Sequence, residues 1–208
     1  PSFYAFDDNP FESFDIQLAS YYDFIYYEAF CKRYQGFTDG EIEDKNIDLN
    51  LFSSGVSVGW LQNSKNHSLS AVYDLDGKQA SSSGSAILGF GVFYMSILGD
   101  DKNIKWYSDK QHFIYFGPNV GYSYTFIFSK NIFVNMNLVI GLDAGLNSNT
   151  NKWLFIPLLM PKMSFGHHHN TWSINVTAGC NYTAVMWDIN TIDNLIPSTM
   201  TVTFSKRF

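Results

Sequence analysis

The stretch "NIFVNMNLVIGLDAGL", residues 131–146, alternates between apolar and polar positions along its length. One parity carries Ile132, Val134, Met136, Leu138, Ile140, Leu142 and Ala144, and the other carries Asn135, Asn137, Gly141, Asp143 and Gly145. Successive side chains of a strand point to opposite faces, so a period of two predicts a β-strand with one apolar and one polar face.

Three further stretches repeat this alternation: 83–98, 111–128 and 171–187. Strands of soluble proteins average about 5–6 residues, whereas these runs are long enough to cross a bilayer at a steep tilt. A switch of apolar parity predicts a bulge near residues 53–55, and Pro157 and Pro161 predict a locally broken ladder. Less regular strands are expected at 12–22, 23–34, 46–60, 67–75, 151–165 and 200–208, which brings the total to about ten.

The composition excludes several classes of protein. The 208 residues fit one domain over 1–208 and are 46% hydrophobic, 18% aromatic and only 15% charged, with a mean hydropathy of -0.09. Ordinary soluble domains carry roughly 25% charged residues. The net charge of -6 and the lack of a dense Lys/Arg run argue against nucleic acid as a partner. No apolar run reaches the roughly 18 residues of a transmembrane helix.

Hydrocarbon offers no hydrogen bonds to backbone groups, so strands cross it only within a closed sheet. We therefore predict an all-β fold, namely a transmembrane antiparallel up-and-down β-barrel of about ten strands. Because each strand needs roughly 9–11 residues to span the bilayer, a chain of this length allows eight to twelve strands. The glycines at 89, 91, 117, 121, 141, 145 and 179 share the inward parity. All five tryptophans lie at or beyond strand ends, as expected at a bilayer interface.

The polar faces supply the candidates for the barrel interior. The lumen-facing candidates are Glu28, Lys32, Asn119, Asn135, Asn137, Asp143 and Asn175. We expect Glu28 and Lys32 to take part in a buried pair or a hydrogen-bond network inside the lumen rather than to line a conducting path. Cys31 and Cys180 lie inside strand-like runs, where a free thiol is expected.

His167, His168 and His169, within the predicted turn "GHHHN" (166–170), form the densest cluster of potential metal ligands. Adjacent histidines rarely converge on one ion, so a solvated turn is expected and neither a metal nor another cofactor is assigned. A predicted loop carries three potential calcium ligands, Asp100, Asp101 and Asp109. Their spacing is not that of an EF-hand, so a polar surface loop is expected.

A hydrolase would need a nucleophile oriented by a base near the barrel rim. The loosely suitable neighbours are His67 with Ser68, and His112 near Ser108. Both histidines are expected to be solvated, because each lies where a strand meets a turn.

The chain ends in "MTVTFSKRF" (200–208). A C-terminal strand ending in Phe resembles the recognition signal of Gram-negative outer-membrane barrels, which implies that the barrel assembly machinery reads Phe208. More narrowly, three segments resemble a family known only as domain of unknown function 4421, of predicted outer-membrane barrels: "RYQGF" (33–37), "SGSAILGFGVFYMSILGD" (83–100) and "GPNVGYSYTFIFSKNIFV" (117–134). The resemblance covers residues 12–185 and implies no activity or catalytic residues. It also implies a longer N-terminus, with a signal peptide and further strands.

The leading hypothesis is a porin-like, non-enzymatic protein of the cell outer membrane, serving as a structural or interaction component or as a narrow pore. Its expected partners are outer-membrane lipid, the barrel assembly machinery and other membrane proteins. One open alternative is an outer-membrane enzyme acting on lipid or peptide. Another is a soluble lipocalin-like barrel, although Gly, Asn and Thr faces would line an apolar cavity poorly. If Phe208 lies on the periplasmic side of the membrane, the connectors at 99–110 and 188–196 are expected on the outer side. The connector at 38–46 is then expected on the periplasmic side.

Overall fold

The computed structural model describes residues 3–4, 14–39, 46–99, 111–148, 152–180, 182–188, 191–195 and 198–206. The elements are β1 (Phe3–Tyr4), β2 (Phe14–Tyr21), β3 (Ile25–Asp39), β4 (Asn46–Leu61), α1 (Leu69–Tyr73), β5 (Ser83–Gly99), β6 (Gln111–Ile127), β7 (Ile132–Asn147), β8 (Lys152–His168), β9 (Trp172–Cys180), β10 (Tyr182–Asp188), β11 (Thr191–Leu195) and β12 (Ser198–Lys206). In the described ranges, α1 is far too short to span a bilayer, and no other helix is present.

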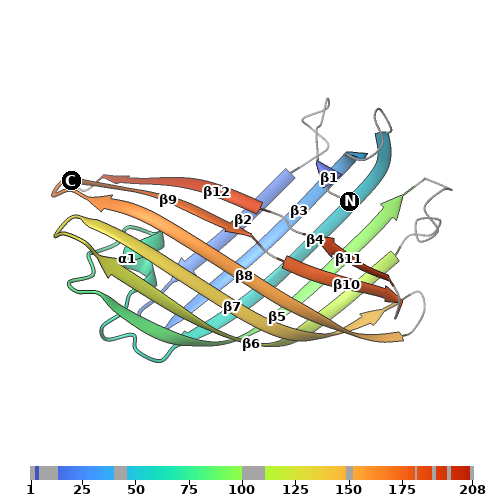
Figure 1. The fold of residues 1–208 in the computed structure, drawn as a ribbon, viewed down its shortest axis with the longest axis horizontal. Helices are drawn as coiled ribbons and strands as arrows, with labels where there is room; N and C mark the ends of the chain where they lie inside the picture. Colours follow the sequence, from blue (N-terminus) through green and yellow to red (C-terminus); the bar gives the residue numbers. More distant parts are fainter. Residues whose placement is uncertain are drawn as a thin grey trace.

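The strands form one antiparallel up-and-down sheet that curls into a half-barrel (Figure 1). Nine strands follow one another along the path β2–β3–β4–β5–β6–β7–β8–β9–β12. The all-β antiparallel meander is thus confirmed, but with nine strands on this path instead of about ten. Within the described residues, no pairing joins β2 to β12.

The neighbour of β8 changes along its length. β8 pairs with β7 without interruption, while on its other side it pairs with β10 up to Leu159 and with β9 from Lys162 onward. The change falls at Pro161, which has no backbone N–H to donate. The predicted break in the ladder is therefore confirmed on one side of β8.

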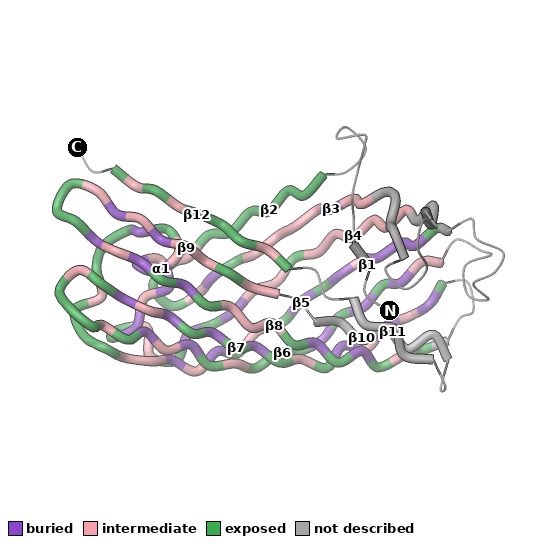
Figure 2. Tube along the Cα trace, turned by 45° about the horizontal axis from the view of Figure 1, so that its top comes forward, coloured by how far each residue is buried: buried purple, intermediate pink, exposed green. Residues whose placement is uncertain are grey.

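The outer face of the sheet is apolar and exposed. Burial alternates along nearly all of β6 and β7, and Figure 2 shows the same alternation on neighbouring strands. Leu138 is 48% exposed and Phe204 is 63% exposed, whereas Asn135 is 0% and Asn137 is 9% exposed. The predicted orientation, with apolar side chains outward and amides and glycines inward, is therefore confirmed.

The inner face is not polar throughout, in contrast to the expected glycine and amide lining. Toward the strand ends that face away from α1, the buried residues are Phe93, Met95, Ile97, Phe113, Tyr115, Ile156 and Leu158. The rings of Phe30, Phe93 and Tyr115 stack in sequence, with centroid distances of 6.0 and 5.2 Å. One half of the interior is therefore filled with aromatic and aliphatic side chains.

The bulge predicted near residues 53–55 is wrong. β4 pairs with β5 in continuous register from Leu49 to Leu61. The irregularity lies between Gln35 and Phe37 of β3. The apolar parity switches because Leu51 faces inward and joins the apolar half of the interior.

The strand predicted at 67–75 is also wrong. Residues 62–82, hereafter the plug segment, leave the sheet between β4 and β5 and contain α1 (Figure 1). Leu69, Ala71 and Val72 of α1 are buried against the inner face of the sheet. The plug segment lies at the same end of the sheet as the turns 22–24 and 128–131.

Because residues 67–75 are not a strand, one strand fewer than expected precedes β5. The connectors before β5 therefore lie at the opposite end of the sheet from the one predicted. β3 and β5 are both antiparallel to β4, so their ends Asp39 and Gly99 lie at the same end of the sheet. The 38–46 connector therefore leaves the sheet on the same side as the 99–110 connector, and the opposite placement expected from the sequence is wrong.

The inward glycines give room to side chains of neighbouring strands, and Gly117 is the most constrained by backbone. A Cβ there would lie 2.5 Å from the carbonyl oxygen of Leu142 and 2.7 Å from Cα of Asp143, whereas at Gly141 the nearest atom is 3.3 Å away. We expect Gly117→Ala to lower the free energy of unfolding by about 1–3 kcal/mol and Gly141→Ala to have a clearly smaller effect. Urea unfolding followed by tryptophan fluorescence measures both, and equal losses would contradict the steric explanation.

Candidate functional site

The plug segment is tied by side-chain hydrogen bonds to strands that are distant in sequence. His67 Nε2 lies 3.0 Å from Ser123 Oγ of β6. Tyr73 OH donates to Asn135 Oδ1 of β7 at 3.0 Å. Asn175 of β9 donates from Nδ2 to a backbone carbonyl of α1. The plug segment is therefore fixed against the inner face at one end of the sheet as an integral part of the fold.

Local capping holds α1 together, because a helix of one turn is unstable alone. Ser68 is the N-cap, and its Oγ accepts a hydrogen bond from the N–H of Ala71 at 3.2 Å. Leu75 follows the C-cap with φ of 57°, a left-handed conformation that costs a branched residue about 1–2 kcal/mol. The cost is offset because Leu75 is 1% exposed and packs with Val72 and Phe133.

An apolar cluster lies beneath the plug segment. Leu69 packs with Tyr26, Leu61, Ile87 and Val139, which come from four different strands. Burial of a leucine contributes about 1.5–3 kcal/mol, against about 1 kcal/mol for an ordinary hydrogen bond. Apolar packing therefore anchors the plug segment at least as strongly as its polar contacts.

An ion pair crosses the interior between β3 and β8. Lys162 Nζ donates to Glu28 Oε1 at 2.5 Å, and Tyr21 OH donates to the same oxygen at 2.9 Å. Lys162 Nζ also lies 5.9 Å from the ring centroid of Tyr73 in α1, and the rings of Tyr21 and Tyr73 lie 5.1 Å apart. This cluster connects β2 and β3 with β8 across the curl of the sheet, and Tyr73 of the plug segment packs beside it.

Glu28 and Lys32 both face inward but have different partners. Lys32 is 5% exposed, and its Nζ lies 3.0 Å from Asp15 Oδ2. Tyr34 OH donates to the same carboxylate oxygen at 3.1 Å. The two residues thus belong to separate ion-pair clusters, not to one shared pair.

The remaining lumen-facing candidates lie buried on the inner face. Asn135 donates from Nδ2 to Ser123 Oγ at 3.0 Å and to Thr125 Oγ1 at 2.9 Å. Within the described part of the chain, one side-chain oxygen has no hydrogen-bond partner in each of Asn119, Asn137, Asp143 and Asn175. These buried oxygens therefore leave hydrogen-bond acceptor capacity unused on the inner face.

His67 was expected to be solvated beside Ser68, and this expectation is wrong. His67 and Ser123 are both 0% exposed. Among the residues that the structure describes, no side chain bonds to Nδ1 of His67, so no described carboxylate orients the imidazole as in a hydrolytic triad. Ser123 Oγ also accepts a hydrogen bond from Asn135. The contact between His67 and Ser123 therefore holds the plug segment and lacks the features of a hydrolytic site.

Acid is expected to weaken the plug segment through His67. Burial lowers the pKa of His67 below its usual 6.5, so in the window just below that value the unfolded chain binds a proton that the folded chain does not. Stability is therefore lost as the pH falls below about 6.5, by up to about 1.4 kcal/mol per pH unit. We expect His67→Gln to flatten this slope in urea unfolding measured between about pH 5 and 8. Parallel slopes for the two proteins would contradict a role of His67.

The histidine run is not the turn that was predicted at 166–170. β8 continues to His168, which is 5% exposed, stacks on Phe133 at 4.9 Å and lies with Nδ1 3.0 Å from Ser173 Oγ. His167 and His169 lie against the ring of Trp172, with centroid distances of 5.3 and 5.4 Å. Since His168 faces away from the other two, the three imidazoles do not converge. Nowhere in the described ranges do three His, Cys, Asp or Glu side chains gather around a metal position.

The other candidates lie on the outer face or outside the described residues. His112 is half-buried, with Nδ1 2.7 Å from Tyr94 OH. Cys31 and Cys180 are both free thiols. Outside the described residues lie Asp100, Asp101, Ser108, Asp109 and the proposed assembly signal Phe208.

Comparison with known proteins identifies a family but no characterised relative. The model of the domain of unknown function DUF4421 matches residues 5–205, which include every strand from β2 to β11 and most of β12. No curated protein and no solved structure matches the chain. Because the match covers nearly the whole chain, the protein belongs to the DUF4421 family.

Proposed function

We propose that the protein is an outer-membrane β-barrel whose lumen is closed in its resting state by the plug segment. The observation that carries this proposal is the apolar outer face. Soluble monomers rarely expose contiguous apolar patches larger than a few hundred Å². Here exposed apolar side chains occur on strand after strand and include Leu18, Val56, Leu88, Val120, Leu138 and Phe165.

The height of the apolar face fits a bilayer. On β8, Trp153 and Phe165 are 61% and 53% exposed and share the outer face. At about 3.3 Å per residue they are about 40 Å apart along the strand, or about 30 Å across the bilayer at a tilt of about 40°. Trp60, 43% exposed, lies at the α1 end of β4, so large aromatic rings flank the apolar face at both ends.

Membrane insertion requires that the edges of β2 and β12 be covered, because unpaired backbone groups are very costly in hydrocarbon. We therefore infer that the half-barrel is completed to a closed barrel in the bilayer. Tight turns at 22–24, 128–131 and 169–171 favour the α1 end as the periplasmic side, where such barrels have short turns. The plug segment then closes the periplasmic mouth.

Site-specific labelling tests the proposal. In a background in which Cys31 and Cys180 are replaced by Ser, Leu138→Cys places a thiol on the outer face and Lys130→Cys places one in a turn. In liposomes, we expect a membrane-impermeant maleimide to label Lys130→Cys and to leave Leu138→Cys largely unlabelled. Unfolding the protein in hot sodium dodecyl sulfate should make both thiols reactive and so shows that each cysteine is present and reduced.

Heat-modifiable gel mobility provides the control for a folded barrel in the same samples. A protein that stays soluble without detergent, or that labels equally at positions 138 and 130 in liposomes, would contradict the membrane location.

A further inference from the structure

The polar capacity that the inner face leaves unused consists of acceptors. Among the described residues, the buried oxygens without a hydrogen-bond partner belong to the side chains of Asn119, Asn137, Asp143 and Asn175. In the same ranges, no fully buried amide nitrogen lacks a partner. The inner face is therefore suited to a ligand that carries positive charge or donates hydrogen bonds.

Asp143 of β7 is the carboxylate in this set. It is 1% exposed, and its Oδ2 has no partner in the described part of the chain. The inner-face lysines whose side chains the structure describes are bound to other acids, Lys32 to Asp15 and Lys162 to Glu28. A carboxylate removed from water is stable only when a cation or a proton neutralises it. Asp143 therefore needs a positive charge that no described side chain supplies.

Glycines make room for this carboxylate and for a second acceptor beside it. A Cβ at Gly117 of β6 would lie 2.5 Å from Oδ1 of Asp143, so the carboxylate lies directly over that glycine. Asn119, two residues further along β6, is 5% exposed, and its Oδ1 lies over Gly89 of β5. Because Asn119 pairs with Gly141, it is the diagonal neighbour of Asp143, with roughly 7–8 Å between their Cα atoms. Two buried acceptors thus share one small region of the inner face.

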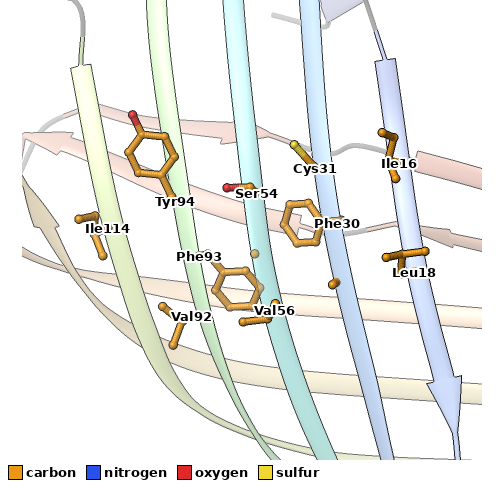
Figure 3. A pocket seen from close by; sticks show the side chains of 12 residues that line it. Ile16, Leu18, Phe30, Cys31, Ser54, Val56, Val92, Phe93, Tyr94 and Ile114 are labelled. Carbon is orange, nitrogen blue, oxygen red and sulfur yellow. The ribbon is translucent and has the colours of Figure 1, made fainter.

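Apolar side chains border this region on two sides. Ile156 of β8 pairs with Asp143 and is 0% exposed. In the opposite direction, the ring of Phe93 lies beside that of Phe30 (Figure 3) and covers Gly91 of β5. Between apolar walls the local dielectric is lower than in water, so the carboxylate attracts a counter-ion more strongly.

We propose that Asp143 binds one small monovalent cation, sodium or potassium, on the inner face of the sheet. The ion contacts the carboxylate directly and reaches Oδ1 of Asn119 through a water molecule of its hydration shell. One positive charge neutralises the single carboxylate, whereas a divalent ion would leave a net positive charge in the interior. Transition metals are disfavoured because they prefer nitrogen and sulfur ligands, which neither Asp143 nor its neighbours Gly117 and Ile156 supply.

The cation site requires only the inner face of the sheet and is independent of the proposed membrane location. Urea unfolding of the full chain at pH 8, followed by tryptophan fluorescence, is measured in sodium, potassium or choline chloride at equal ionic strength. Choline is too bulky for a buried site and controls for charge screening. With the preferred alkali ion at about ten times its dissociation constant, the ratio of folded to unfolded chain should be about elevenfold higher than in choline.

Three variants locate the ion. Asp143→Asn keeps the shape of the side chain but removes its charge, so it should lose the alkali-ion effect and be more stable than the native chain in choline. Asp23→Asn removes an exposed carboxylate between β2 and β3 and should keep the full effect. Asn119→Leu retains the carboxylate but removes the second acceptor, so it should need several-fold more of the ion for the same stabilisation.

Sodium-23 relaxation measures binding without unfolding the protein. The native chain should broaden the sodium resonance, added potassium should reverse the broadening, and Asp143→Asn should show neither change. A native chain equally stable in sodium, potassium and choline would overturn the site and would mean that a proton neutralises Asp143. Equal alkali-ion effects in the native chain and in Asp143→Asn would also overturn it, because the ion would then bind elsewhere.

Discussion

Replacing Lys162 by Met is expected to lower the free energy of unfolding by about 2–3 kcal/mol. The substitution leaves the Glu28 carboxylate on the inner face with Tyr21 as its remaining described partner. Removing one member of a fully buried ion pair costs about 3–5 kcal/mol. The cost is smaller here because the two side chains are 27% and 26% exposed, so water screens part of the lost interaction.

The double variant Glu28→Gln with Lys162→Met is the matched control. It removes both charges, so most of the lost stability should return, to within about 1 kcal/mol of the native chain. Urea unfolding in detergent micelles, followed by tryptophan fluorescence, measures all three proteins. A double variant as unstable as Lys162→Met alone would show that the loss comes from packing and not from the unpaired carboxylate.

The long strands could be predicted because one physical pattern determines them. The alternation over 111–128 and 131–146 corresponds to β6 at Gln111–Ile127 and β7 at Ile132–Asn147. In these strands nearly every outward position is apolar and nearly every inward position is small or polar, so local sequence and tertiary environment agree. The same pattern also predicted that the apolar face points outward and the small or polar face inward.

The plug segment could not be predicted because its sequence fits two periods. Leu69, Ala71 and Tyr73 alternate as in a strand, yet Leu69 and Val72 are also one helical turn apart. Burial of Leu69 against residues of four strands decides the conformation, and that contact is not visible locally. The error then propagated, because counting a strand there reversed the predicted side of the 38–46 connector.

Parity predicts which face a side chain occupies but not its partner. Glu28 and Lys32 were both assigned inward, and both face inward, yet Glu28 pairs with Lys162, which is 134 residues away in sequence. Only the curl of the sheet brings β3 and β8 together. The signal that was overlooked is Lys162 itself, the single charged residue in the stretch "LLMPKMSF" (158–165).

Deleting the plug segment is expected to open the interior at the α1 end of the sheet. Residues 63–82 can be replaced by a flexible Gly-Ser linker of about five residues, which is long enough to reach from Gln62 to Ser83. The Gln62 N–H then keeps its bond to the Ala86 carbonyl, and Ser85 keeps its pairing with Ser123. Ser123→Cys, in a background lacking the native cysteines, reports access to the inner face. Ser123 is 0% exposed beneath His67, so removal of the plug should raise its rate of maleimide labelling by about a hundredfold.

The labelling rate of Ser129→Cys, in an exposed turn at the same end of the sheet, should be unchanged by the deletion and serves as the control. Planar-bilayer recording adds a second measurement. The buried aromatic residues in the other half of the interior, such as Phe93 and Phe113, keep the lumen narrow, so small conductance steps are expected where the native chain gives none. Rapid labelling of Ser123→Cys with the plug segment present would mean that the plug opens readily by itself. The barrel would then be open at rest. That result would contradict the proposal that the ion pair and the apolar cluster hold the plug segment in place.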